Sequence, residues 1–247
     1  MAGYIVNASI DERGKASGGV AGDQTGKEVC TRTWYSRPWD MMIRYPDKEI
    51  AKRARDIAIK IANSKLVGYD QAGRNTLYNE LAKYKWDVDK YLRSGERSEC
   101  DCSSFVYTVY CVLIPKLRGC RNAPTTSTSE NFYKQYGFNV YKSKKYLQST
   151  SKLVAGDLLN AAGHHIVMYC GNNTNITKEK SNSNVKYYKK CRDEYVSLVD
   201  ALSSIGVDSS FNTRKKIAYK NGIKNYSGTS EQNTKLLCLL KNGKLIK

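Results

Sequence analysis

The stretch CSSFVYTVYCVLI at residues 102–114 is apolar on nearly every side of a helix. A helix of this kind has to be packed against other elements all round, so it belongs in the centre of a fold. No apolar run in the chain approaches the roughly 18–20 residues that are needed to cross a bilayer. We therefore expect a soluble protein without a transmembrane segment, with this helix at its centre.

Further helices and strands are predicted around this central helix. Asp47 is a natural N-cap for a helix whose apolar positions recur at helical spacing. The pattern repeats near Leu77 and Leu81, and Ser127 with Glu130 predicts a capping box for a short helix. Strands are predicted at residues 4–6, 138–141, 156–161 and 164–171, with a weaker candidate at 185–190. Because helices mostly precede strands, the fold class is α+β, with helices packed on one antiparallel sheet.

The end of the chain differs from the rest in composition. The sequence is strongly polar after residue 171, and from about Val207 it predicts two short helices. The second begins with a capping box of Thr229 with Gln232 and stops at Gly243. About forty residues bury little core alone. We expect a main domain at 1–204 and a small helical module at 205–247, which either docks on the main domain or is a small binding module.

The charge and the cysteines narrow the class of protein. The chain holds 41 Lys and Arg against 23 Asp and Glu, a formal charge of +18, which attracts polyanions such as nucleic acid, anionic membranes or wall teichoic acids. Aromatic-basic stripes for single-strand stacking are not evident, so we do not expect a nucleic-acid partner. The eight cysteines include no C-x2-C pair, and the start of the chain lacks a secretion signal. We expect free thiols and no metal site.

The candidate chemistry lies in two motifs. Cys102 comes in the first turn of the central helix, where unpaired N–H groups and the positive end of the helix dipole stabilise a thiolate. The only histidines are His164 and His165, which are adjacent at the start of a predicted strand and so point to opposite faces. They cannot both ligate one metal from the same side. A thiol paired with an imidazole is an activated nucleophile for acyl transfer, although a buried structural cysteine gives the same pattern.

These motifs resemble a known family. The sequence DCSSFV at a helix start, followed by AGDLLNAAGHHIVMYCG, resembles the NlpC-type papain-like cysteine peptidases that cut bacterial cell-wall peptides. The resemblance implies Cys102 as nucleophile and His165, rather than His164, as base. It further implies that Tyr69, Asp101 and Ser103 bind substrate, and that no cofactor is needed. Ser104 departs from the family, since many relatives have glycine there.

The third residue of the family's triad is missing from its usual place. The family has a polar residue on the strand after the histidine strand. Here the histidine strand ends at Gly171 and is followed by NNTNITKEKS, which does not supply that strand. The strand GYIVNAS at the start of the chain resembles the missing one. We infer a circular permutation that places Asn7 beside His165. The adjoining block ASIDERGKASGGVAGDQTGKEV is similar to segments of phage cell-wall hydrolases from Gram-positive hosts, which supports the permuted arrangement.

The resemblance implies a peptidoglycan hydrolase of the endolysin type. It would cut an amide of the stem peptide through a thioester, as an endopeptidase or an N-acetylmuramoyl-L-alanine amidase. Its expected partners are Gram-positive peptidoglycan and anionic wall polymers. Without a signal peptide, it would be made in the cytoplasm and reach the wall after holin-type release. The alternative is a non-catalytic basic protein that binds wall polymer or nucleic acid on a degenerate peptidase fold.

Overall fold

A computed structural model describes residues 3–119, 123–172, 187–223, 225–243 and 245–247. The chain divides into two compact units, Met1–Lys178 and Glu179–Lys247. Each unit has its own hydrophobic core, and each is described here by itself.

The first unit contains a six-stranded sheet in the order β2-β1-β8-β7-β3-β6, with every neighbouring pair antiparallel. Its strands are β1 (Tyr4–Ala8), β2 (Val29–Thr33), β3 (Met41–Arg44), β6 (Asn139–Tyr141), β7 (Leu158–Ala161) and β8 (His165–Gly171). A separate parallel pair joins β4 (Val67–Tyr69) to β5 (Ser98–Cys100). The prediction of helices combined with an antiparallel sheet is confirmed.

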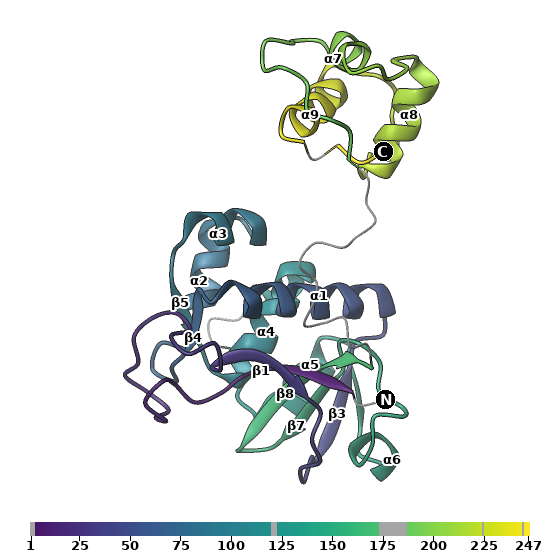
Figure 1. The fold of residues 1–247 in the computed structure, drawn as a ribbon. Coiled ribbons are helices and arrows are strands. Elements are labelled where there is room, and N and C mark those ends of the chain that lie inside the picture. Colours follow the sequence, from purple (N-terminus) through teal and green to yellow (C-terminus); the bar gives the residue numbers. More distant parts are fainter. Residues whose placement is uncertain (1–2, 120–122, 173–186, 224, 244) are drawn as a thin grey trace. The chain divides into compact units, whose positions relative to one another are not determined.

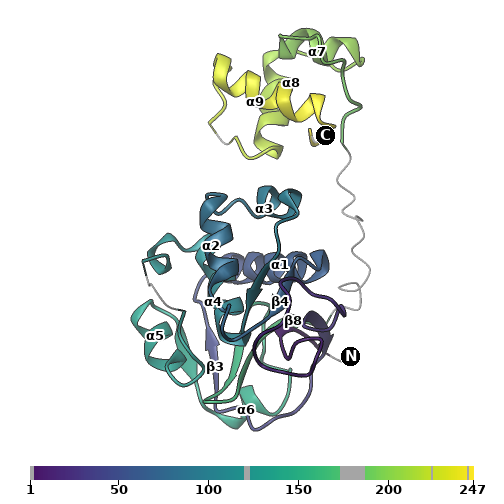
Figure 2. The ribbon, with the colours of Figure 1, turned by 90° about the vertical axis from the view of Figure 1, so that its left-hand side faces the viewer.

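Helices cover one face of this sheet. They are α1 (Lys48–Ser64), α2 (Thr76–Lys83), α3 (Val88–Ser94), α4 (Cys102–Leu113) and α5 (Ser129–Gln135), with a 3-10 turn η1 at Pro115–Leu117. The short helix α6 (Lys144–Leu147) lies on the other face, where its Leu147 belongs to the same apolar cluster as Ile5. The helices α1 and α4 contact each other and lie along the sheet (Figure 1). In Figure 2, α2 and α3 lie beyond them, on the side away from β3 and β8. Every residue of α4 from Cys102 to Cys111 is buried, which confirms the predicted central helix.

Both faces of the sheet are covered, because apolar side chains point to both sides of its inner strands. On β1 and β8, Val6 and Met168 belong to the core shared with α1 and α4. Their neighbours Ile5 and Tyr169 belong to a second apolar cluster on the opposite face. The strands β1 and β8 pair directly, with Ile5 opposite Tyr169. The first strand of the chain is therefore an inner strand of the sheet, beside the His165 strand.

The predicted helix boundaries have mixed outcomes. Asp47 caps α1 by accepting hydrogen bonds from two backbone N–H groups, as predicted. The capping box expected from Ser127 and Glu130 is wrong, because α5 begins at Ser129, one residue later than expected, with Thr128 at the N-cap and without a side-chain cap. Thr128 Oγ1 instead accepts a hydrogen bond from the backbone N–H of Thr125, so it stabilises the preceding turn.

The second unit is helical, with α7 (Leu198–Ser204), α8 (Phe211–Lys220) and α9 (Ser230–Lys241). The predicted capping box of Thr229 with Gln232 is present. The division between the units falls at 178/179, earlier than the boundary at 204/205 that the sequence suggested. The reason is α7, whose Leu198 and Leu202 are buried in the same cluster as α8 and α9. Of the strand candidate at 185–190, Tyr187 forms one isolated bridge, and residues 185–186 lie outside the described part.

Candidate active site

Cys102 is the first residue of α4, and the start of that helix is fixed by two reciprocal hydrogen bonds. The carboxylate of Asp101 accepts from the backbone N–H of Ser104 at 2.6 Å. In return, the hydroxyl of Ser104 accepts from the backbone N–H of Asp101 at 2.8 Å. This is a capping box, which satisfies two backbone donors at once. The serine that departs from the family pattern therefore stabilises the turn that carries Cys102.

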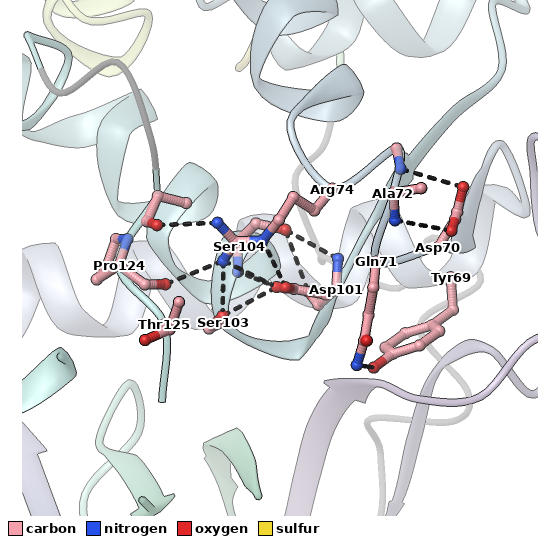
Figure 3. A network of polar contacts seen from close by, with 12 residues as sticks. Tyr69, Asp70, Gln71, Ala72, Arg74, Asp101, Ser103, Ser104, Pro124 and Thr125 are labelled. Carbon is pink, nitrogen blue, oxygen red and sulfur yellow. Dashed lines mark hydrogen bonds and ion pairs between the residues drawn. The ribbon is translucent and has the colours of Figure 1, made fainter. Parts of the chain in front are cut away.

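Arg74 ties the same turn to two loops (Figure 3). Its guanidinium forms an ion pair with Asp101 at 2.6 Å and donates to the hydroxyl of Ser103 at 2.9 Å. It also donates to the carbonyl oxygens of Ala123 and Pro124. Asp101 and Ser103 are both buried, and Ser103 donates to Asp101. The predicted substrate-binding residues Asp101 and Ser103 are thus engaged in hydrogen bonds within the protein.

The thiol of Cys102 is 6% exposed. Burial raises its pKa to about 11, and the negative charge of Asp101 adds to this effect. The backbone N–H groups of Ile166, Ser103 and Cys102 itself lower the pKa, but they do not offset burial. The expectation that the helix start alone yields a thiolate is therefore not met, because the loss of water around the sulfur outweighs the helix N–H groups.

His165 begins β8 and is 9% exposed, whereas the adjacent His164 is exposed. Its Nε2 lies 3.4 Å from the side-chain nitrogen of Asn7 on β1. The other amide atom, Asn7 Oδ1, is buried without a hydrogen-bond partner among the described residues. A half-turn of this amide exchanges the two atoms and lets Oδ1 accept from a protonated Nε2. The structure thus brings Asn7 to the ring of His165, as the sequence predicted.

The thiol and the imidazole belong to neighbouring segments. The backbone N–H of Ile166, which points to the sulfur of Cys102, is part of the peptide bond that follows His165. Asn7 faces Nε2 of the imidazole, so Nδ1 is the ring nitrogen left for another partner. Burial first, and then the positive charges of Arg37 and Arg32, together lower the pKa of His165 to about 4. At neutral pH this imidazole is uncharged and able to accept a proton.

A cavity of about 440 Å³ opens beside the imidazole. It is lined by Ser9, Ile10, Arg32, Tyr35, Arg37, Tyr69, His164 and His165. Tyr69, which the sequence predicted as a substrate contact, therefore lies in the same cavity as His165. Burial raises the pKa of Tyr69 to about 12, so its hydroxyl is protonated at neutral pH and can donate a hydrogen bond.

The glycine-rich loop before β2 holds Tyr69 in place. The carboxylate of Asp23 accepts hydrogen bonds from four backbone N–H groups of this loop, including that of Val29. Glu28, which follows in the loop, accepts from the backbone N–H of Tyr69 at 2.9 Å. A Cβ on Gly68 would lie 2.5 Å from the carbonyl oxygen of Gly22, so only glycine permits this close approach. The GDQTG block is thus a structural support for the cavity wall.

Potential metal ligands can be checked in the described part of the chain. Those residues include no group of three or more His, Cys, Asp or Glu side chains arranged to hold a metal ion. The sequence placed both histidines on one strand, but β8 begins at His165, and the exposed His164 lies in the turn before it and lines the same cavity. In the same described ranges, none of the helices combines the length and apolarity that a bilayer span requires.

Sequence reasoning missed four residues of this region: Arg74, Glu28, Arg32 and Arg37. The hydrogen bond of Arg74 with Asp101 joins residues that are 27 positions apart in the sequence. The hydrogen bond from the backbone of Tyr69 to Glu28 joins residues that are 41 positions apart. Each pairing depends on how loops fold over the sheet, so a single sequence carries no periodic pattern that would reveal it. Arg32 on β2 and Arg37 after it lie outside both of the motifs that carried the sequence prediction.

Short segments of the chain are similar to two curated phage proteins. The L-alanyl-D-glutamate peptidase of Listeria phage A118 is 60% identical over 47 residues, which is 19% of this chain and 17% of that protein. The endolysin of Listeria phage A511 is 50% identical over 46 residues, which is 19% of this chain and 14% of that protein. The matched segments thus span less than a fifth of either relative. No solved structure matches.

A family match covers a much larger part of the chain. The endolysin-like domain family matches residues 5–176. These residues include β1, α4 and β8, and they end close to the boundary of the first unit at residue 178. Asn7, Cys102 and His165 all lie within the match. The chain belongs to the endolysin-like domain family.

Proposed function

We propose that the first unit hydrolyses an amide bond of the peptidoglycan stem peptide, with Cys102 as nucleophile, His165 as base and Asn7 as the residue that orients the imidazole. The observation that carries this proposal is the meeting of three distant segments. The backbone N–H of Ile166, which follows His165 along the chain, lowers the pKa of the Cys102 thiol, and the ring of His165 contacts Asn7. A thiol, an imidazole and an orienting amide in this order are the groups of a papain-like triad.

The reaction starts from two neutral groups. Because burial opposes a lone thiolate and a lone imidazolium, the proton leaves Cys102 for His165 as the sulfur attacks the amide carbonyl carbon. The carbonyl oxygen gains negative charge, and the backbone N–H of Cys102 at the helix start is a donor suited to stabilise it. The imidazolium then protonates the departing amine, the C–N bond breaks, and a thioester remains. Water attacks the thioester with His165 accepting its proton, which returns to the thiolate.

The other predicted site residues have separate roles in this proposal. Tyr69 contacts the substrate, because it lines the cavity beside His165. Asp101 and Ser103 act on the substrate through the start of α4, since their polar atoms are bonded to each other, to Arg74 and to the helix backbone. The arrangement resembles an NlpC-type papain-like domain in which the strand after the histidine strand has moved to the front of the chain. The pairing of β1 with β8 supports this circular permutation.

The family match and the relatives support the cell wall as substrate. One relative is named for the bond between L-alanine and D-glutamate, and the other is named an endolysin. For this chain we propose an amide of the stem peptide, cut by an endopeptidase or an N-acetylmuramoyl-L-alanine amidase. We also propose that the second unit binds anionic wall polymer. Its α8 carries Lys215 and Lys216 beside Tyr219, which is 67% exposed.

The decisive experiment replaces the nucleophile. Cys102→Ala should lower the rate at which purified Gram-positive walls lose turbidity by at least about a thousandfold, as removal of a triad nucleophile does. Cys111→Ala is the matched control, because Cys111 is a buried thiol in the same helix. Both variants should keep the wild-type circular dichroism spectrum. Undiminished lysis by Cys102→Ala would exclude the catalytic proposal and favour a non-catalytic basic binding protein.

A further inference from the structure

The cavity beside His165 contains two arginines without an acidic partner among the described residues. Arg32 on β2 donates only to neutral atoms, the carbonyl oxygen of Lys27 at 3.4 Å and the sulfur of Cys30 at 3.3 Å. Arg37, in the loop after β2, lies with its guanidinium carbon 5.9 Å from the ring centre of Trp39. By contrast, Arg44 and Arg74 of the same unit each form an ion pair. Their partners are Asp157 and Asp101.

The position of these two arginines matters more than the total charge of the chain. Both line the same cavity as His165 and Tyr69, so a ligand in this cavity meets the arginines and the imidazole together. Arg37 also borders a second cavity of about 600 Å³, lined on its other side by Lys142 and Lys144. A substrate bound beside the imidazole therefore has cationic groups next to it and farther along the surface.

We infer that Arg32 and Arg37 form an anion subsite that recognises a free carboxylate of the peptide substrate next to the bond that is cut. This inference rests on the proposed function, and it names the chemical class of the substrate: a peptide amide beside an acidic residue. Arginine suits this role because its planar fork donates two parallel hydrogen bonds to a carboxylate. A carboxamide at the same position accepts fewer hydrogen bonds and carries no charge.

A bound carboxylate would also help the chemical step. In the free site the positive charges of Arg37 and Arg32 oppose protonation of His165. A carboxylate between the guanidinium groups neutralises this effect and so favours the imidazolium that forms when His165 takes the proton of the thiol. The preference for an acidic substrate should therefore be visible in kcat as well as in binding.

The test compares two synthetic muropeptides that differ only in the acidic residue of the stem, as the free carboxylate or as the carboxamide. Binding is measured by calorimetry with the full-length Cys102→Ala chain, so it does not depend on turnover. The carboxylate form should bind about tenfold tighter, as expected for hydrogen bonds to a charged group. Adding Arg32→Gln and Arg37→Gln should abolish this preference. Arg93→Gln, which removes one exposed charge from α3, is the control and should leave the preference intact.

The outcomes separate this inference from the proposed function. Equal binding of the two muropeptides by the Cys102→Ala chain, or a preference that survives both arginine substitutions, overturns the subsite. The subsite is also overturned if the Arg32→Gln, Arg37→Gln double variant keeps its preference for the carboxylate muropeptide but no longer binds poly(glycerol phosphate). The arginines would then bind a wall polymer instead. If the preference is found but the wild-type chain cleaves neither muropeptide, the subsite stands and the proposed hydrolysis fails.

Discussion

The two units of the chain differ in what they bury. Among the described residues, all buried polar and charged side chains lie in the first unit, between Asn7 and His165 along the chain. The core of the second unit consists of apolar side chains, chiefly leucines of α7 and α9 with Ile217 and Ala218 of α8. Burial of a polar group costs free energy unless hydrogen bonds compensate it. The first unit meets that requirement with networks such as the one around Arg74 and Asp101 (Figure 3).

This difference indicates where each unit can act. The first unit keeps a buried thiol, a buried imidazole and a buried amide together, which has no evident purpose in packing alone. The second unit has an interior that only stabilises it, so any binding by this unit must use its surface. The +18 charge of the chain does not distinguish the two, whereas burial does.

The largest effect expected from this comparison is on the pH dependence of stability. His165 has its pKa lowered from the usual 6.5 to about 4, so the folded first unit resists its protonation. It contributes stability that is present above pH 6.5 and is lost as the pH falls toward 4. The loss amounts to at most about 3 kcal/mol. Between pH 7 and pH 4.5, urea unfolding should therefore show a larger loss of stability for the wild-type first unit than for His165→Gln.

Comparison of these two chains at the same pH is essential. Glu28 has its pKa raised to about 7, chiefly by burial, so its contribution has the opposite sign: it is present at low pH and lost as the pH rises through 7. Both chains contain Glu28, so its effect cancels in the difference. The unfolding transition of the second unit, which lacks His165, should not differ between them. An equal loss of stability in both chains would show that His165 is not held neutral by burial.

The sequence predicted those features that depend on neighbours along the chain. Asp47 at the start of α1 and Thr229 at the start of α9 are caps, and the chain within four residues determines a cap. The contact of Asn7 with His165 spans 158 residues and was found only through a resemblance to a family. The ion pair of Arg74 with Asp101 was not predicted, because it depends on the path of loops.

Two expectations failed for a common physical reason. A helix-start cysteine indicated a thiolate, yet the pKa of Cys102 is raised, because the depth of burial is a property of the assembled fold. The boundary near residue 205 was placed where the composition changes, but the packing of Leu198 and Leu202 puts α7 in the second unit. Composition describes the surface of a segment better than its place in a core.

Asn7→Ala tests whether the buried amide serves catalysis rather than packing. Loss of the orienting contact leaves the imidazole of His165 free to turn, and misplacement of a catalytic group by about 1 Å can cost about 100-fold in rate. We expect kcat to fall about 10- to 100-fold, less than for Cys102→Ala. Asn7→Asp, which keeps an acceptor at this position, should retain more activity than Asn7→Ala at equal stability.

The control for this variant is Asn172→Ala, at the end of β8. Its side chain accepts a hydrogen bond from the hydroxyl of Tyr169, but it does not contact His165. Activity on walls should change little in Asn172→Ala. If both alanine variants have the same kcat, Asn7 has no orienting role, and the permuted triad loses its third member.

The smallest expected effect concerns the surface of the second unit. On α8, Lys215 and Lys216 line a hollow of about 530 Å³ with Tyr219, and an anionic polymer laid there gains charge contacts and one aromatic face. Lys215→Gln with Lys216→Gln should weaken cosedimentation with purified walls several-fold at low salt, with a smaller difference at high salt because exposed charges are screened. Cleavage of a soluble muropeptide should not change. Lys235→Gln, exposed on α9, controls for loss of charge from the same unit. The single variant Lys216→Gln is measured beside it, so that one charge is removed in each. If Lys235→Gln weakens wall binding as much as Lys216→Gln does, the attraction comes from net charge rather than from the α8 surface, and the second unit acts as a general polycation.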